Sequence, residues 1–302
     1  MENEIIIISS ILSSIFTGLF LYFYIPLIKN KILDYPNHRS SHINPIPTSG
    51  GISFVIIGSI SSILMGNYVS IIFFPLVIVG FIDDVIGLSA LTRFLTQVST
   101  SIFLILYSNS NLFNIDISIS GFIVSIILIF GSTSIINFVN FMDGLDGLLA
   151  GCFSIIIFTS SFLFYPSLFP FFSAVLVFLS FNWSPAKIFM GDSGSTFLGA
   201  LYVYILINSP SIAALAGLIT ISAPLLIDAI YTLILRLKFR QPLFSSHRSH
   251  LYQRLNQSGF SHAMVSLIYI ISTFIISVSF VLGGYLIAFI IAFSYIFIAI
   301  YI

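Results

Sequence analysis

The chain has 302 residues, of which 58% are hydrophobic and only 7% charged, and its ten Lys and Arg residues balance its ten Asp and Glu residues. This composition, with a mean hydropathy of +1.13, excludes a soluble globular protein and indicates a polytopic helical membrane protein. The longest polar stretch, about 236–261, is too short to fold around a core of its own. We therefore expect one integral-membrane domain over residues 1–302 and no nucleic-acid partner.

Apolar runs separated by short polar breaks predict an all-α fold with about eleven membrane-spanning helices. The first run lacks the basic start of a cleavable signal peptide, so it is expected to remain as a helix. In chain order the predicted spans are 5–28, 51–65, 68–82, 91–107, 119–136, 147–163, 167–181, 195–208, 211–235, 263–280 and 284–301.

Charged residues segregate to one side of this predicted topology. If the chain changes sides at every span, all ten Lys and Arg residues fall on a single face. The positive-inside rule makes that face cytoplasmic and places both termini outside. The same face receives Asp34, Asp83, Asp84, Asp143, Asp146 and Asp192. Because ionisable groups at the edge of a bilayer are costly, we expect an active site on this face.

The first two cytoplasmic loops carry opposite charges. Arg39 and His42 lie in a Pro-rich loop and supply donors suited to a phosphate, although a turn with solvated cations is the alternative. In the second loop the adjacent Asp83 and Asp84 repel one another unless a cation or a proton lies between them. The pair therefore indicates Mg²⁺, a nearby base such as Arg93, or a raised pKa, and a simple helix cap is the alternative.

The third loop has the densest pattern, in which four polar residues recur every three positions: Asn137, Asn140, Asp143 and Asp146. On one helix this spacing would present two amides and two carboxylates along a single groove. The interleaved Gly144 and Gly147 would let a ligand approach the backbone. A polar capping turn is the alternative.

The last two cytoplasmic loops add a metal ligand and cations. Gly191 to Ser195 directly precede an apolar span, where exposed amides favour an anion and Asp192 could hold the Mg²⁺ that shares it, although an ordinary cap is the alternative. His247, Arg248 and His250 form a cationic patch suited to a diphosphate. Zinc is disfavoured because the flanking arginines would repel it, and anionic lipid is the remaining alternative partner.

Asp228 lies inside the ninth predicted span, and we expect it to pair with a cation on a neighbouring helix in a structural role. The five loops together suit phosphoryl transfer between a nucleotide-activated donor and a lipid phosphate. The alternative from another class is an ion-coupled transporter. Transporter sites usually lie near the membrane midplane between repeats, whereas these acids collect at one face and no repeat is visible.

The residues between 34 and 255 resemble the polyprenyl-phosphate N-acetylhexosaminyl-1-phosphate transferases, a group within glycosyltransferase family 4. The matching motifs, in order, are DYPNHRSSH, PIPTSGG, DD, NxxNxxDGLDGL, FMGDSGS and HRSHLYQ. The resemblance implies transfer of a sugar 1-phosphate from a UDP-N-acetylhexosamine to undecaprenyl phosphate, with release of UMP. It also implies Mg²⁺, with Mn²⁺ as an alternative ion, and a multi-pass location in the bacterial inner membrane. A homodimer is a further expectation.

The resemblance also implies residue roles. Asp192 would be the principal Mg²⁺ ligand with Asn140 as a second ligand. We assign Asp83, Asp84, Asp143 and Asp146 as the catalytic carboxylates, the first two either deprotonating the lipid phosphate or assisting the metal, the last two lining the nucleotide-sugar pocket. The expected substrate-binding residues are Arg39, His42, Thr48, Arg93, Asn137, Asn140, His247, Arg248 and His250.

The late motif carries the substrate expectation. His-Arg-Ser-His-Leu-Tyr-Gln differs from the His-His run of the peptidoglycan branch and from the Asp-Arg-X-His-X-His form of the enterobacterial-antigen branch. It is similar to the branch that initiates O antigen, so synthesis of O antigen or another surface polysaccharide is expected and a peptidoglycan-precursor enzyme is disfavoured. The expected mechanism is a direct displacement, with a covalent aspartyl-phosphate route as its alternative.

Overall fold

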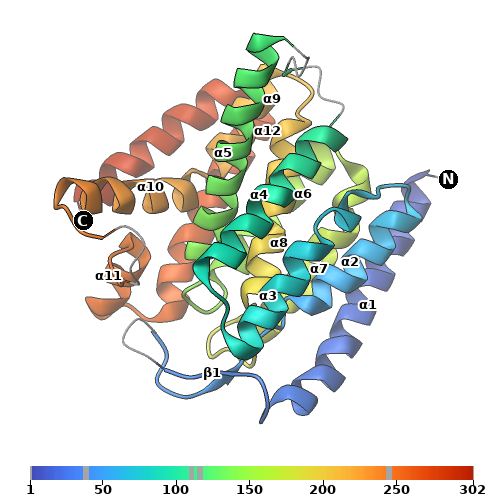
Figure 1. Ribbon diagram of the computed structural model, residues 1–302, viewed down its shortest axis with the longest axis vertical. Helices are drawn as coiled ribbons and strands as arrows, with labels where there is room; N and C mark the ends of the chain where they lie inside the picture. Colours follow the sequence, from blue (N-terminus) through green and yellow to red (C-terminus); the bar gives the residue numbers. More distant parts are fainter. Residues whose placement is uncertain (1, 37–40, 109–111, 114–117, 243–246, 302) are drawn as a thin grey trace.

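Helices make up nearly all of the fold in the computed structural model, which describes every residue except 1, 37–40, 109–111, 114–117, 243–246 and 302 (Figure 1). Within the described residues the α-helices are α1 (Glu2–Ile28), α2 (Ile52–Leu64), α3 (Phe74–Ile86), α4 (Ala90–Tyr107), α5 (Ile119–Phe141), α6 (Leu148–Leu163), α7 (Phe169–Asn182), α8 (Asp192–Ile207), α9 (Ile212–Ile221), α10 (Ala223–Lys238), α11 (Leu251–Gln257) and α12 (His262–Tyr301). Two 3₁₀ turns, η1 (Val69–Ile71) and η2 (Pro166–Leu168), precede α3 and α7. The predicted all-α class is confirmed.

The only sheet among the described residues is a pair of two-residue strands in the first predicted cytoplasmic loop. Strand β1 (Leu33–Asp34) pairs antiparallel with β2 (Ile46–Pro47), so that Leu33 lies opposite Pro47. The pair closes the loop at its base and directs the chain that follows, Thr48 to Gly51, toward the start of α8.

The helices have the lengths and composition of a multi-pass membrane protein. Four stretches in the described part of the chain are long and apolar enough to cross a bilayer: Asn3–Ile28, Ala90–Tyr107, Ile119–Phe141 and His262–Ser294. Four shorter apolar helices accompany them, among them α6 and α8. The number of spans and the sides of the two termini stay predictions.

Three predicted spans near the end of the chain differ from the helices observed. The ninth, 211–235, is a pair of helices, α9 and α10, bent by 73°. Pro224 lies in the first turn of α10, where its ring and its missing N–H prevent a helix from continuing through Ser222. The last two, 263–280 and 284–301, lie in one element, α12, which has non-helical backbone at Gly284 with φ 77° and ψ 179°.

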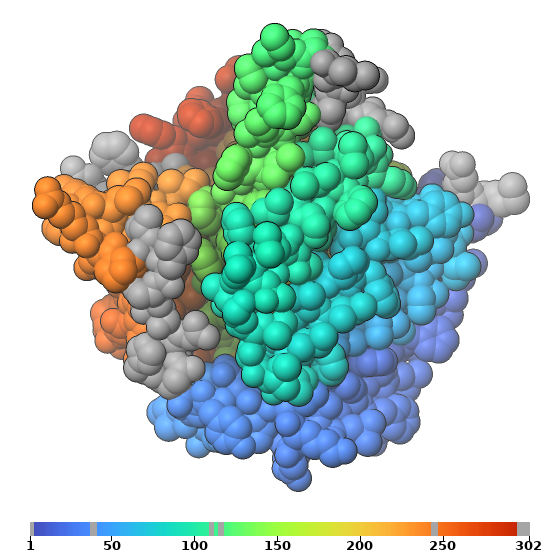
Figure 2. All heavy atoms as spheres, viewed as in Figure 1, coloured from blue at the N-terminus to red at the C-terminus, as the bar shows by residue number. Residues whose placement is uncertain are grey.

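Helix α8 is the central element, and it contacts α2, α3, α4, α5, α6 and α9. All of its residues are buried except Asp192 in the first turn and Tyr204, which are half-buried. On the face shown in Figure 2, α3, α4 and α5 lie side by side over this helix. The surrounding packing therefore fixes the position of the turn that carries Asp192.

Glycines allow two segments to touch the start of α8. A Cβ atom on Gly80 of α3 would lie 2.6 Å from the backbone nitrogen of Ser193. A Cβ atom on Gly51 would lie 2.4 Å from the Cα atom of Gly194. Real Cβ atoms do not approach backbone this closely, so only glycine fits at either position. Gly80 therefore lets the last turn of α3, with its two aspartates, lie against the first turn of α8.

Candidate active site

Asp84 connects the end of α3 to the beginning of α8. Its Oδ1 accepts a hydrogen bond from the backbone N–H of Asp192 at 2.8 Å, and its Oδ2 accepts bonds from the hydroxyls of Ser49 at 2.8 Å and Ser193 at 3.3 Å. The first N–H groups of a helix have no partner within the helix, and Asp84 satisfies one of them from another element. Ser49, which the sequence did not single out, is thus part of the site.

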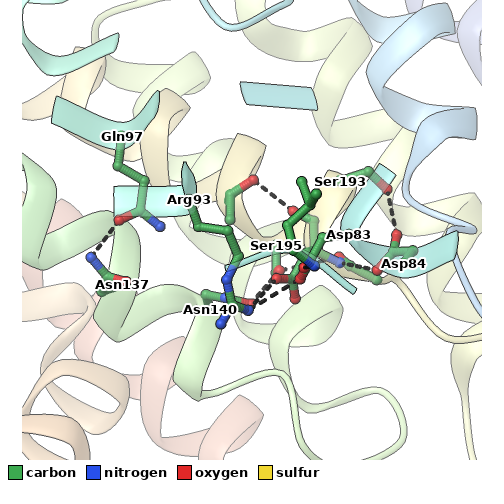
Figure 3. A network of polar contacts seen from close by, with 12 residues as sticks. Asp83, Asp84, Arg93, Gln97, Asn137, Asn140, Ser193 and Ser195 are labelled. Atoms are coloured by element: carbon green, nitrogen blue, oxygen red, sulfur yellow. Dashed lines mark hydrogen bonds and ion pairs between the residues drawn. The ribbon is translucent and has the colours of Figure 1, made fainter. Parts of the chain in front are cut away.

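Arg93 lies between two carboxylates. Its Nη1 is 3.1 Å from Oδ2 of Asp83 and 3.3 Å from Oδ2 of Asp192, so one guanidinium joins α3, α4 and α8 (Figure 3). The other oxygen of Asp83 accepts from the backbone N–H of Leu88. The sequence assigned Arg93 to the substrate phosphates, whereas in the structure its guanidinium pairs with two carboxylates of the protein itself. Its side chain remains 38% exposed and reachable by a ligand.

The two predicted amides lie on α5, one turn apart, with different partners. Oδ1 of Asn140 accepts a hydrogen bond from the Ser195 hydroxyl at 2.7 Å, which places Asn140 one turn along α8 from Asp192. Nδ2 of Asn137 donates to Oε1 of Gln97 at 2.6 Å and to the carbonyl of Thr133 (Figure 3). Gln97 was missed by sequence reasoning. Its signal was its place four residues after Arg93, on the same face of α4.

The four-residue polar row does not lie on one helix, because α5 ends at Phe141. Asp143 and Asp146 therefore lie in the connection to α6, and the expected single groove is wrong. Asp143 is near enough to the acid cluster for the charges of Asp192 and Asp84 to act on it. Asp146 instead is 3.2 Å from Nδ1 of His262 and accepts from the backbone N–H of Ala186.

Burial and mutual repulsion raise the proton affinity of the acids near α8. Burial, followed by the charge of Asp192, raises the pKa of Asp84 to about 7. Burial, followed by the charges of Asp192 and Asp84, raises the pKa of Asp143 to about 8. Burial, followed by Asp83, also raises the pKa of Asp192. A bound cation would relieve this repulsion.

The donor set fits Mg²⁺. Within the described ranges no three His, Cys, Asp or Glu side chains form a closed metal-binding group. Magnesium, however, is usually held by one or two carboxylates together with water and substrate phosphates. Three carboxylates around the single guanidinium of Arg93 leave an excess of negative charge. Asp192, with Asn140 beside it, is the position from which a carboxylate and an amide oxygen would hold the ion.

The second half of the first loop, residues 47–51, pairs with the chain just before α8 and so reaches the site. Phe189 N–H donates to the Pro47 carbonyl, and the N–H groups of Gly50 and Gly51 donate to the carbonyls of Phe189 and Met190. Predicted residue Thr48 is buried within this pairing. His42 packs against the Phe189 ring, 5.0 Å between centroids, and its Nε2 is 3.3 Å from the Asp34 carbonyl. Arg39 falls outside the described residues.

The late loop places its two histidines differently from its arginine. His250 is buried and its Nδ1 lies 3.2 Å from Asp228, whereas His247 is half-buried and stacks on His250. Burial, followed by the nearby His250 and Arg236, lowers the pKa of His247 to about 4. Arg248 is exposed. The sequence led us to expect that Asp228 pairs with a cation on a neighbouring helix, whereas the structure gives it His250 and the backbone N–H groups of Leu251 and Tyr252 as partners.

The comparisons with known proteins agree with this arrangement. The family model described as glycosyl transferase family 4 matches residues 66–209, which hold α3 to α8 and all three carboxylates of the cluster. A probable undecaprenyl-phosphate N-acetylglucosaminyl 1-phosphate transferase of Bacillus subtilis is 29% identical over 92% of this chain and 85% of its own length. A decaprenyl-phosphate N-acetylglucosaminephosphotransferase of Mycolicibacterium smegmatis is 33% identical over 78% of this chain and 71% of its own.

A third relative comes from another branch. A phospho-N-acetylmuramoyl-pentapeptide-transferase of Staphylococcus haemolyticus is 34% identical, over 57% of this chain and 66% of its own length. A membrane-embedded transferase with its acids gathered at helix ends is thus the class that the fold and the site define. The chain belongs to the polyprenyl-phosphate hexosamine-1-phosphate transferase family.

Proposed function

We propose that this protein transfers an N-acetylhexosamine 1-phosphate from a UDP-sugar to undecaprenyl phosphate at the cytoplasmic face of the bacterial inner membrane. The observation that carries the proposal is the convergence of Asp83, Asp84 and Asp192 with Arg93 at the ends of α3, α4 and α8. Two phosphorylated substrates repel one another, and a site for their reaction needs both a metal-binding group and a cation.

The proposed reaction is a single displacement. An oxygen of the lipid phosphate forms a new bond to the phosphorus that carries the sugar, and the bond from that phosphorus to the UMP oxygen breaks. UMP leaves, and the lipid carries a diphosphate-linked sugar. Asp83 and Asp84 are the candidates for accepting the proton of the lipid phosphate. A covalent aspartyl-phosphate intermediate is the alternative, and trapping phosphorylated protein with the sugar donor alone would favour it.

Magnesium is the proposed cofactor, with Mn²⁺ as an alternative. Held by Asp192 and Asn140, the ion would neutralise negative charge on the phosphates during the displacement. Arg93 lies beside Asp192 and its side chain is 38% exposed, which supports a role for its guanidinium in binding the phosphates of the donor. The chain's own contribution is to hold these groups in fixed positions before the substrates arrive.

The proposed pathway is the initiation of O antigen or another surface polysaccharide. The HRSHLYQ motif supports this choice over peptidoglycan synthesis. The relative named for N-acetylglucosaminyl 1-phosphate transfer matches 92% of the chain, which supports an N-acetylhexosamine 1-phosphate as the group transferred. The relative named for phospho-N-acetylmuramoyl-pentapeptide transfer matches 57%.

The experiment is UMP release by the purified protein with undecaprenyl phosphate, Mg²⁺ and a panel of UDP-N-acetylhexosamines. Release that depends on one sugar, the lipid and the metal together is the expected result. If the folded protein releases no UMP with any of the sugars, the proposal is refuted. Uptake of ions or sugars into vesicles, without lipid labelling, would then favour the transporter.

A further inference from the structure

Asp228 is a buried carboxylate outside the acid cluster, and the displacement described above does not use it. It lies in α10 with 3% of its surface exposed. Its Oδ1 accepts from the backbone N–H of Leu251 at 2.8 Å and lies 3.2 Å from Nδ1 of His250. Its Oδ2 accepts from the backbone N–H of Tyr252 at 3.0 Å and from the Tyr269 hydroxyl at 2.6 Å.

These bonds point mainly at one short segment. Three of the five donors belong to residues 250–252, where the late loop enters α11, and the other two are the hydroxyls of Tyr269 and Thr232. A buried carboxylate is tolerated only when hydrogen bonds replace its lost hydration, and here the replacement comes from the late loop itself. Asp228 and this segment therefore keep one another in place.

A column of three rings extends from this anchor. The His247 and His250 rings are stacked with centroids 5.1 Å apart, and the His250 and Tyr252 rings with centroids 5.6 Å apart. The Tyr252 hydroxyl donates to the carbonyl of Phe141 at 3.0 Å, at the end of α5. A Cβ atom on Gly144 would lie 2.1 Å from that hydroxyl, so the connection carrying Asp143 packs closely on the same ring. The column therefore joins the late loop to the α5–α6 connection, which carries Asp143.

The contact with Asp228 also favours one tautomer of the His250 imidazole. A carboxylate only accepts hydrogen bonds, so Nδ1 of His250 carries a proton in this arrangement. The ring nitrogen left for a ligand is then Nε2, in an orientation fixed by the carboxylate. Without that contact the proton can move to the other ring nitrogen, while the neighbouring rings still hold the plane of His250.

We propose that Asp228 is a positioning residue for sugar-phosphate transfer, which acts by orienting His250 and the first turn of α11 against the α5–α6 connection. The inference rests on the proposed function, since the group positioned is the one expected to meet the diphosphate. Asp228 itself touches no substrate.

A double-mutant cycle tests the coupling. Asp228→Asn, His250→Gln and the double variant are compared with the parent by UMP release, and kcat/KM is measured for the UDP-sugar that the parent uses. Asp228→Asn is expected to lower kcat/KM by about 10- to 100-fold. If Asp228 acts through His250, the same change costs less than about 3-fold when His250 is already Gln. Equal factors in both backgrounds would overturn the proposal.

Thr232→Val is the matched control. The Thr232 hydroxyl donates to the same carboxylate at 3.3 Å but does not belong to the late loop. Its loss is expected to change kcat/KM by less than about 3-fold, and a loss as large as that of Asp228→Asn would indicate a merely structural carboxylate. Should Asp228→Asn not fold, Asp228→Glu, which keeps the charge and moves it by one methylene, takes its place in the cycle.

Hydrogen exchange separates this inference from the proposed function. The amides of Leu251 and Tyr252 are expected to exchange at least about 10-fold faster in Asp228→Asn than in the parent, whatever the sugar substrate is. Unchanged exchange would refute the anchor even if UMP is released. Faster exchange in a protein that releases no UMP would leave the anchor standing and remove the proposed reaction.

Discussion

The carboxylate of Asp84 accepts a hydrogen bond from the backbone N–H of Asp192, a residue 108 positions further along the chain. The contact fixes two acids of the cluster relative to one another through the backbone of one and the side chain of the other. Asp84 uses one oxygen on the backbone and the other on Ser49 and Ser193. Asp192 is left with its side chain beside Arg93.

Asp192→Asn is expected to lower UMP release by roughly 1,000-fold. The amide retains the size of the side chain but not the charge that would hold the metal. Because its backbone N–H still bonds Asp84, thermal unfolding in detergent should change by only a few degrees, to be checked by intrinsic fluorescence. Parental activity in a folded Asp192→Asn protein would disprove the metal assignment.

Gly191→Ala is expected to destabilise the protein by about 1–3 kcal/mol or to prevent folding. Gly191 has φ +74°, and a Cβ atom there would lie 2.3 Å from Oδ2 of Asp84. Gly131→Ala is the matched control, since a Cβ atom at Gly131 of α5 meets nothing within 4 Å. Thermal midpoints of the two variants give the comparison. Equal midpoints would show that Asp84 does not constrain the start of α8.

Arg93→Gln is expected to lower both the Mg²⁺ concentration that the reaction requires and its maximal rate. Removing the guanidinium leaves Asp83 and Asp192 with less opposing charge, so the half-saturating Mg²⁺ concentration should fall by about 3- to 10-fold. The rate at saturating Mg²⁺ should fall because a cation near the phosphates is lost. Arg93→Lys is the control that keeps the charge. A higher Mg²⁺ requirement in Arg93→Gln would contradict this arrangement.

The Asp146–His262 pair should make stability depend on acidity. Burial alone would raise the pKa of Asp146, but its hydrogen bond and ion pair with His262 lower it below the usual value. A carboxyl with a lowered folded pKa stabilises the protein above its unfolded pKa of about 4, and the stabilisation is lost as pH falls through the folded value. Asp146→Asn should therefore cost about 1–2 kcal/mol at pH 7, and this cost should shrink as pH falls below about 4.

The measurement is the thermal midpoint of the parent and Asp146→Asn from pH 7 down to about pH 2, a range that extends below the unfolded pKa of the carboxyl. A difference that stays constant across this range would show that the carboxylate charge is not responsible. His262→Gln serves as the control, since it removes the partner and leaves Asp146 in place.

Much of the fold followed from hydropathy alone, because the apolar runs coincide with helices. The ends of several helices could not be predicted, because they depend on packing against other helices. The fifth helix continues to Phe141, past its predicted end at 136, since Asn137 and Asn140 find partners on α4 and α8. The ninth span breaks at Ser222, where Pro224 follows. The spacing of three residues between Asn137, Asn140, Asp143 and Asp146 suggested one continuous helix, but α5 ends at Phe141.

The candidate site was predictable as a set of residue types but not as a set of contacts. Acids at helix ends identified Asp83, Asp84 and Asp192 correctly as neighbours of a common site. Ser49 and His262 escaped notice because nothing near them in the sequence signals their partners, which lie on other elements. Gln97 was missed although its place four residues after Arg93 sets it on the same face of α4. Local spacing also could not distinguish Asp146, which pairs with His262, from Asp143, which faces the cluster's charges.

The enclosure of α8 has a consequence for how this protein can change over time. One residue inserted in a helix turns everything beyond it by about 100° and moves it by about 1.5 Å. Within α8 such an insertion would put apolar side chains in the wrong gaps on every side, because all but two of its residues are buried. Length variation among descendants of this sequence should therefore fall in the first and late loops, while the turn at Asp192 is inherited intact.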